Sequence, residues 1–493
     1  MRSPLPLREE NLHRLADHVS VPGYDRAALR PGVVHISVGS FHRSHQAVYF
    51  DDLATLGERD WGIVGVGLRR PDLLRALSHQ DGLYTVVERG AEQGKARVVG
   101  AMTSHLLAPQ NETAVLAALT DERTALVTLT ITGAAYQLDP AGAVAAETPL
   151  FTPAAHPAPS CAIGYITEAL DRRRRAGRAP FTVVSCDNLP GNGDVARAAV
   201  VSLARRHDER LASWIEERVE FPNGMVDRIT RKATMADREL VARDFGVLDR
   251  GPVITEAFSQ WVLEDRFCNR RPPLDLVGVQ FVDDVTPYAL MKTRLLNASH
   301  CAIGFLGSLA GLRSTDRVMR EQVFADYVRS LMDEEIAPLL PDVPGVDLAS
   351  YTRTLLERLA NPAIADDLQR LRRAASSKFP SHVLPSIVQA REQGREHRLL
   401  TIAVAAWLRA LCGKDELGRR ISFDDPLATR MQAVARASGT DPRPLLWQFG
   451  LFGELAQDLE FADSLEDAFV SLERDGVRAA LAACLEPEGS LAS

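Results

Sequence analysis

The stretch VVHISVGSFHRSHQAVYFDDL, residues 33–53, places a β-branched run, a turn of small residues and a helical pattern in direct succession. Val33–Val38 (VVHISV) has the apolar, β-branched composition of a buried strand. The amphipathic spacing from His45 to Leu56 predicts a helix after it. A strand followed at once by a helix is the building unit of an α/β fold, so this stretch predicts that fold class.

The same alternation continues through the first half of the chain. Further strand-like runs occur at 61–67, 83–87, 125–132 and 181–186. Helical periodicity separates them at 71–78, 112–119 and 161–174. Apolar strands that alternate with helices predict a largely parallel sheet covered on both faces. Residues 137–160 are rich in Pro, Ala and Thr, which predicts an irregular surface loop.

The second half of the chain has a different character, because helical patterns dominate from about Tyr288 and no convincing strands occur. The boundary is expected near Asp284. A chain of 493 residues is long enough for two or three domains. We therefore expect two unlike domains, residues 1–284 and 285–493.

Composition excludes several classes of protein. The hydrophobic share of 46% is that of an ordinary globular chain rather than a disordered one. A formal charge of −8 lacks the positive field of a typical nucleic-acid binder. The N-terminus shows no secretory signal and no apolar run is long enough to cross a bilayer, so we expect a cytoplasmic protein without a membrane partner. The six cysteines form no C-x-x-C pair, so no metal site is expected.

The turn after the first strand is a candidate dinucleotide site. A strand, a small-residue turn and a helix start expose backbone N–H groups to an anion such as a pyrophosphate. The G-x-G-x-x-G pattern is incomplete, since Ser37 occupies its first position and His42 its last, and a plain strand-to-helix turn has the same spacing. The candidate cofactor-binding residues are Val38, Gly39, Ser40, Phe41, His42 and Arg43.

Asp72 is the candidate acid for the adenosine ribose, because it follows the second predicted strand. Arg69 and Arg70 precede it and would equally favour a 2′-phosphate, so NADP is an alternative to NAD. A solvated charged loop is the third interpretation.

Two polar turns follow later strands. Asn188, in SCDNLPGNG, offers a neutral amide able to donate to an oxyanion, although a plain Asx-turn fits the same residues. Asp227, in FPNGMVDRIT, either serves a site or pairs with Arg228 or Arg231. Neither turn decides a function alone.

The segment PYALMKTRLLNASH, residues 287–300, carries the most chemistry. On an α-helix, Lys292, His300 and Asn297 lie at roughly 0°, 80° and 140°, so one face presents all three. Apolar neighbours would desolvate the amine, which lowers a lysine pKa and favours a neutral base. A snorkelling lysine with a buried structural histidine is the alternative. Tyr288 and Lys292 also form the Y-x-x-x-K pair of short-chain dehydrogenases, but there the pair lies near the end of the chain, unlike here.

Taken together, the chain resembles the long-chain polyol dehydrogenases, the mannitol dehydrogenase family, over nearly its full length. The pieces that carry the resemblance, in order, are VHISVGSFHRSHQAVYFDDL (34–53), LYTVVERG (83–90), SCDNLPGNG (185–193), FPNGMVDRIT (221–230), ITEAFSQWVLEDRF (254–267) and PYALMKTRLLNASH (287–300). The resemblance implies a Rossmann-type N-terminal domain with insertions, which binds the dinucleotide, and a mostly α-helical C-terminal domain, which binds substrate.

The resemblance also implies roles for individual residues. Lys292 is then the general base in a reaction without metal, and Asn188 and Asn297 stabilise the oxyanion. His300 orients a substrate hydroxyl, and Asp227 lies near cofactor and substrate. Arg370 and Lys378, in DDLQRLRRAASSKFP, bind further hydroxyls by similar position.

The expected function is therefore that of a metal-independent, NAD-dependent oxidoreductase, monomeric like its relatives, with D-mannitol and D-fructose as the leading substrate pair. D-Arabinitol, D-sorbitol and the sugar acids fructuronate and tagaturonate are alternatives. The chain departs from the family at Ala289 and Gly133, where acids are common, which puts the usual proton exit in doubt. These two departures also leave open the alternative that the chain is a family member without catalytic activity, which binds nucleotide and senses sugars.

Overall fold

The computed structural model describes residues 3–69, 71–90, 94–136 and 161–486. The loop expected at 137–160 and Arg70 lie outside the described residues. The chain divides into two compact units, residues 1–286 and 287–493.

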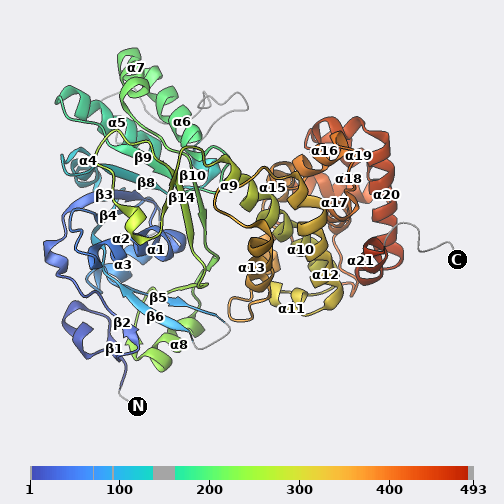
Figure 1. Cartoon of the computed structure of the whole chain (residues 1–493), viewed down its shortest axis with the longest axis horizontal. Coiled ribbons are helices and arrows are strands. Elements are labelled where there is room, and N and C mark those ends of the chain that lie inside the picture. The colour runs from blue at the N-terminus through green and yellow to red at the C-terminus, as the bar shows by residue number, and fades with distance from the viewer. Residues whose placement is uncertain (1–2, 70, 91–93, 137–160, 487–493) are drawn as a thin grey trace. The chain divides into compact units, whose positions relative to one another are not determined.

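The first unit is built on a parallel five-stranded sheet with the order β7-β4-β3-β8-β9 (Figure 1). The strands are β3 (Pro31–Ile36), β4 (Gly62–Gly67), β7 (Met102–Leu107), β8 (Leu126–Leu129) and β9 (Thr182–Ser185). All four pairings between neighbours are parallel. This is the doubly wound order of a Rossmann-type sheet, so the predicted fold class is confirmed.

Helices cover both faces of this sheet, as its nearly continuous apolar strands require. In β3, Val34 and Ile36 belong to one apolar core and Val33 to the other, because successive side chains of a strand point to opposite faces. The first core is closed by α4 (Glu112–Thr120), α5 (Ala162–Arg175), α6 (Asn192–His207) and α7 (Glu209–Arg218). The second contains residues of α2 (Gln46–Thr55) and α3 (Pro71–Ser78).

One expected member of the parallel sheet lies elsewhere. The run at 83–87 forms β5 (Tyr84–Glu88), which pairs antiparallel with β6 (Lys95–Val99). These strands belong to a second five-stranded sheet, β11-β13-β5-β6-β2, with β2 (Val19–Ser20), β11 (Thr230–Arg231) and β13 (Val253–Thr255). A third sheet joins β10 (Gly224–Asp227), β14 (Gln260–Glu264) and β15 (Gln280–Val282). β1 (Leu5–Pro6) pairs with β12 (Val247–Leu248), next to α8 (Met235–Phe245).

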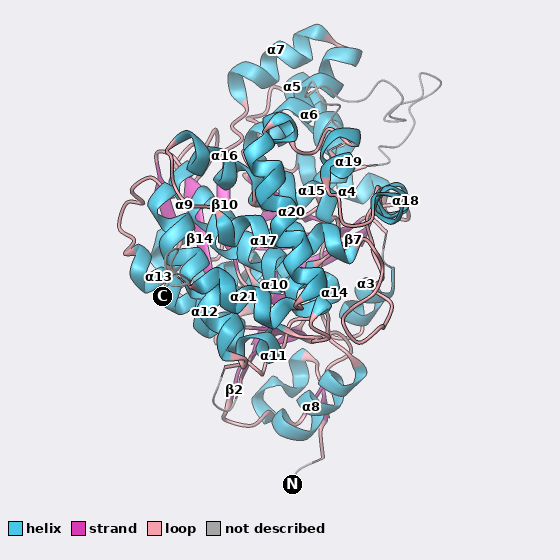
Figure 2. Cartoon of the chain, turned by 90° about the vertical axis from the view of Figure 1, so that its right-hand side faces the viewer, coloured by secondary structure: helices cyan, strands magenta, loops and turns pink. Residues whose placement is uncertain are grey.

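The described residues of the second unit form helices and loops, with no strand among them (Figure 2). Its centre is α10 (Ala298–Leu309), which packs against α14 (Leu368–Leu371), α15 (Ala375–His382) and α17 (Arg398–Ala410). The outer helices are α12 (Gln322–Ser330), α13 (Leu348–Ala360), α16 (Leu384–Glu392), α18 (Ala428–Ser438), α20 (Leu459–Arg474) and α21 (Val477–Leu485). In neither unit is a described helix long and apolar enough to cross a membrane.

Candidate active site

The switch point of the parallel sheet lies between β3 and β8. The chain passes from β3 to β4 on one side and later returns to β8 on the other side of β3. In open α/β sheets, ligands bind outside the carboxyl ends of the strands at this reversal. Ser37–Arg43 follow β3 there, and Thr130–Tyr136 follow β8. The predicted dinucleotide turn therefore stands where the topology expects a ligand.

The turn after β3 contains a residue, Ser37, whose backbone conformation is typical of glycine. Ser37 has φ 78°, a left-handed conformation, and its amide donates to Val66 O at 2.7 Å. Gly39 precedes the short helix α1 (Ser40–Ser44), and no side chain caps that helix. A Cβ added at Gly39 would meet only Ser37 O, at 3.8 Å, so the space above this glycine is open. The turn can thus admit a phosphate group close to the backbone.

The side chains of the turn after β3 differ in how deeply they are buried. His42 is fully buried and stacks on His35 with ring centroids 3.3 Å apart, and Arg43 is held by the carbonyl oxygens of Gly39 and Gly251. Both side chains therefore support the turn from inside the protein. Ser40 and Phe41 are half-buried and Val38 is buried. The backbone of Val38–Phe41 remains the part of this turn best placed for a cofactor.

Asp72 lies in the first turn of α3, after β4, as the prediction for a ribose-binding acid requires. Its side chain is 94% exposed and its carboxylate lies 3.6 Å from Arg75. An exposed pair of this kind leaves the carboxylate accessible to a ribose hydroxyl.

Asn188 follows β9 on a loop that is tied to the strand β10. The Asn192 side chain donates to Gly224 O at 2.9 Å and accepts from Gly224 N at 2.9 Å. These two bonds hold the loop that carries Asn188 beside the strand that ends at Asp227. Sequence reasoning missed Asn192, although its place in the same polar turn was visible.

The arginines next to Asp227 have other partners. Arg228 forms an ion pair with Glu88 at 2.5 Å, and Arg231 pairs with Asp237 at 2.6 Å. Asp227 itself is buried, with 2% of its surface exposed.

Lys292, Asn297 and His300 lie on one helical segment, but that segment is not the regular α-helix expected. Residues Lys292–Asn297 form a π-helical turn between α9 (Thr286–Met291) and α10. Residues five apart lie roughly 140° apart on an α-helix, and the wider i→i+5 ring of a π-turn reduces that angle. The π-turn therefore places Lys292 and Asn297 at a smaller angle to each other than a regular α-helix would.

Two buried polar atoms on this face, one of Asn297 and one of His300, have no hydrogen-bond partner among the described residues. Lys292 is buried, with 8% exposure. Asn297 Nδ2 and His300 Nε2 are both buried and have no hydrogen-bond partner within the part of the chain that the structure describes. Because such atoms are costly unless paired, they mark a place where a polar ligand would bind.

Arg370 and Lys378, the predicted hydroxyl-binding residues, lie near enough to His300 for their charges to act on it. The charges of Asp366, Arg370, Arg358 and Lys378 all act on His300, and burial lowers its pKa to about 3, so the ring is neutral at neutral pH. Arg370 forms a two-pronged pair with Asp366, which is 3% exposed. Lys378 Nζ donates to Leu371 O at 3.0 Å, and burial lowers its pKa.

Two residues of this cluster were missed from the sequence. Asp366 fixes the guanidinium of Arg370, and its pKa stays below the usual value, despite burial, because Arg370 pairs with it. His382, at the end of α15, feels the charges of Lys378 and Lys292, and burial lowers its pKa to about 4. The sequence did contain a signal for Asp366, because this residue lies four positions before Arg370, the spacing of an ion pair on a helix.

The alternative reading of Tyr288 as an acid or base is not supported by its contacts. Its hydroxyl donates to Pro344 O at 2.7 Å, and burial raises its pKa. The phenol therefore has a structural role in the second unit.

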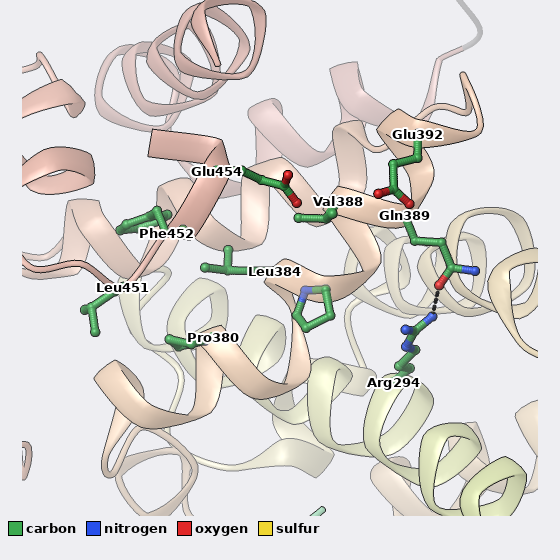
Figure 3. Close-up of a pocket in the computed structure, with 11 residues that line it drawn as sticks. Arg294, Pro380, Leu384, Val388, Gln389, Glu392, Leu451, Phe452 and Glu454 are labelled. Atoms are coloured by element: carbon green, nitrogen blue, oxygen red, sulfur yellow. Dashed lines mark hydrogen bonds between the residues drawn. The ribbon is translucent and has the colours of Figure 1, made fainter. Parts of the chain in front are cut away.

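The π-turn also borders a cavity of about 490 Å³ within the second unit (Figure 3). Arg294 reaches into it and bonds to Gln389, with Leu384 and Phe452 among the apolar lining. Lys292 is not part of that lining. The turn thus presents Arg294 and Lys292 to different surroundings.

Comparison with known proteins identifies two matching family models. Residues 31–276 match the mannitol dehydrogenase Rossmann domain, and residues 284–473 match the mannitol dehydrogenase C-terminal domain. Mannitol 2-dehydrogenase of Aspergillus terreus is 42% identical, over 96% of this chain and 98% of that protein.

Two solved structures are also similar over nearly the whole chain. The ternary complex of Pseudomonas fluorescens mannitol 2-dehydrogenase with NAD and D-mannitol has a TM-score of 0.88 and 40% identity, over 98% of this chain and 100% of that one. A substrate-free D-sorbitol dehydrogenase has a TM-score of 0.88 and 33% identity, over 97% and 100%.

Proposed function

The chain belongs to the mannitol dehydrogenase family, and we propose that it interconverts a polyol and a ketose with NAD, most readily D-mannitol and D-fructose. The similarity to a mannitol 2-dehydrogenase complexed with NAD and D-mannitol supports this assignment. In this proposal residues 1–284 bind the dinucleotide and residues 285–493 bind the polyol.

The observation that carries the proposal is the set of polar atoms around Lys292. Asn297 Nδ2 and His300 Nε2 are buried without partners among the described residues, and the cations Arg370 and Lys378 lie near His300. A polyol supplies a hydroxyl for each such group. Hydroxyls that accept and donate at once would satisfy these donors without bringing a charge into a buried place.

The residues of the first unit fit a dinucleotide. The open space above Gly39, the switch point between β3 and β8, and the exposed carboxylate of Asp72 supply a pyrophosphate turn and a ribose acceptor. When bound, NAD supplies the acceptor for the hydride that leaves the alcohol carbon. Arg69, which precedes Asp72, leaves NADP as the alternative cofactor.

Lys292 acts as the general base in this proposal. It is buried, with 8% exposure, and in this proposal its amine takes the proton of the alcohol. Asn188 and Asn297 donate from their neutral amides to the oxygen as negative charge develops on it. His300 is a neutral imidazole that orients a neighbouring hydroxyl. Asp227, Arg370 and Lys378 bind the remaining hydroxyls.

The first experiment measures NADH formation by the purified chain with NAD and a panel of D-mannitol, D-sorbitol and D-arabinitol. The reverse assay uses NADH with D-fructose, fructuronate and tagaturonate, and NADP replaces NAD in parallel. We expect the highest kcat/KM with D-mannitol and D-fructose. Turnover with none of the panel, together with tight NADH binding, would contradict the proposal and favour a sugar-sensing protein.

A second experiment tests the base directly. Lys292→Ala should lose at least about 100-fold in kcat, the range of a positioned general base, while NADH still binds. Lys414→Ala, which removes an exposed lysine of the same unit, is the matched control and should retain full turnover. Comparable activity in the two variants would refute the role of Lys292.

We also propose that the chain works as a cytoplasmic monomer, as its relatives suggest. Light scattering during size-exclusion chromatography of the active protein would report its mass, and a dimer would contradict this part of the proposal.

A further inference from the structure

Asp187 is a buried carboxylate that accepts hydrogen bonds from three donors at the end of β8. Its oxygens accept from Ile131 N at 3.1 Å, from Thr132 N at 2.7 Å and from the Tyr136 hydroxyl at 2.7 Å. The side chain comes from the loop that follows β9, the strand next to β8. One carboxylate thus holds the whole turn that leaves β8.

This turn contains a strained residue. Thr132 has φ 72° and ψ 153°, a region that is occupied almost only by glycine. A β-branched residue adopts it only where the surrounding structure enforces the conformation. The bond from Thr132 N to Asp187 acts on this residue itself, so the carboxylate is the group that enforces it.

The strained turn lies at the switch point of the sheet. The Thr130 hydroxyl donates to Ser37 O at 2.9 Å, and His35 Nε2 lies 3.1 Å from the same hydroxyl. Ser37, like Thr132, has a left-handed backbone, with φ 78°. Two residues in glycine-like conformations therefore flank the carboxyl ends of β3 and β8, and Thr130 joins the two turns.

We propose that Asp187 is a positioning residue for the cofactor: it holds Thr132 in its glycine-like conformation and so aligns the turn after β8 with the turn after β3. The inference rests on the proposed function, since it takes NAD as the ligand of this crevice. Asp187 does not touch the reacting atoms in this account; it acts through the backbone of residues 130–133.

The chemistry of the three donors requires a carboxylate at this position. An ionised carboxylate only accepts hydrogen bonds, so it can satisfy two amides and a phenol together. An asparagine would turn its NH₂ group towards at least one of these donors. Burial raises the pKa of Asp187, while the Tyr136 hydroxyl and the two amides oppose that rise. These donors are therefore what allows the charge to be buried.

The test compares NADH dissociation constants, measured by fluorescence titration, with thermal unfolding of the same proteins. Asp187→Asn should bind NADH about tenfold more weakly, the effect of leaving a buried donor unpaired. Tyr136→Phe removes one of the three donors and should weaken binding about threefold. Adding Thr132→Gly to Asp187→Asn should restore most of the affinity, because glycine adopts this conformation without the carboxylate.

Asp51→Asn is the matched control. Asp51 is also buried, with 2% exposure against 7% for Asp187. It accepts from the Tyr24 hydroxyl at 2.6 Å, from Gly100 N at 2.8 Å and from Arg97 at 2.6 Å, but it lies in α2 rather than at the switch point. The Asp51→Asn variant should lower the unfolding temperature, as Asp187→Asn does, but should leave the NADH dissociation constant unchanged.

Two outcomes would overturn the inference alone. One is wild-type NADH affinity in Asp187→Asn or, if that variant does not fold, in Tyr136→Phe. The other is equal loss of affinity in Asp51→Asn with no recovery in the double variant, which would indicate general destabilisation. A wild-type chain that binds neither NADH nor NADPH would instead overturn the proposed function, and this inference with it.

Discussion

Glu335 makes the stability of the second unit depend on pH. It lies in a second π-helical turn, Leu331–Ile336, and is 5% exposed. Its two oxygens accept from Leu399 N at 2.8 Å and Leu400 N at 2.9 Å, in the first turn of α17. Burial raises its pKa from 4.5 to about 7, although the two amides oppose that rise.

The direction of the effect follows from proton binding. Between pH 4.5 and about 7 the folded protein holds a proton on Glu335 that the unfolded chain has lost, so stability falls as the pH rises through this range. At about 1.4 kcal/mol for each pKa unit, the difference corresponds to about 3 kcal/mol. Above about pH 7 the free energy of unfolding is lowered by this full amount.

The perturbation is Glu335→Gln, which keeps one acceptor and cannot ionise. Free energies of unfolding come from urea titrations of the full chain, followed by tryptophan fluorescence at low and high pH. Relative to wild type, the variant should gain about 3 kcal/mol between about pH 4.5 and 8. Glu334→Gln, which changes the exposed neighbour, should show no such gain. If the free energies of unfolding of Glu335→Gln and wild type differ by the same amount at every pH in this range, the reasoning is refuted.

Three further changes test the framework of the site. Asn297→Ala should lower kcat/KM about 10²- to 10³-fold with unchanged NADH affinity, and an equal loss of both would contradict its role as oxyanion donor. Gly307→Ala should destabilise the protein by about 1–3 kcal/mol in thermal unfolding, because the added Cβ would lie 2.5 Å from Val318 Cγ2. Unchanged stability would mean that α10 can shift to make room. Gly193→Ala should unfold at lower temperature still, because its Cβ would lie 2.4 Å from the carbonyl oxygen of Phe221, and normal stability would show that this backbone yields.

The parallel strands were predictable because local composition determines them. Runs such as 33–38 and 181–186 place apolar residues on both faces, which is typical of a strand covered on both sides. The run at 83–87 has the same composition, and β5 is buried along nearly its whole length. Its antiparallel partner β6 was not recognised, so its place in a separate sheet could not follow from periodicity. The very short strands β2 and β11 carry too little pattern for any prediction.

The candidate site was predictable where one chain segment carries several groups. Lys292, Asn297 and His300 occur within nine residues, and their common face follows from helical geometry. Asp187 and His382 could not be found in this way. The carboxylate of Asp187 acts on a turn more than fifty residues earlier, and His382 reaches Lys292 from a different helix. Interactions of this kind depend on tertiary packing, which the local pattern does not report.

The π-turn changes the angle between two of the proposed site residues. Asn297 is five residues after Lys292, so on an α-helix the two side chains would lie about 140° apart, at opposite edges of one broad face. The wider ring of the π-turn reduces this angle, while Met291, Leu295 and Leu296 remain buried. Because isolated π-turns are rare and less regular than α-helix, tertiary contacts must retain this one. The second π-turn, Leu331–Ile336, packs directly against it, and Glu335 ties that turn to α17. The relative placement of Lys292 and Asn297, the proposed base and oxyanion donor, therefore depends on two irregular turns that contact each other.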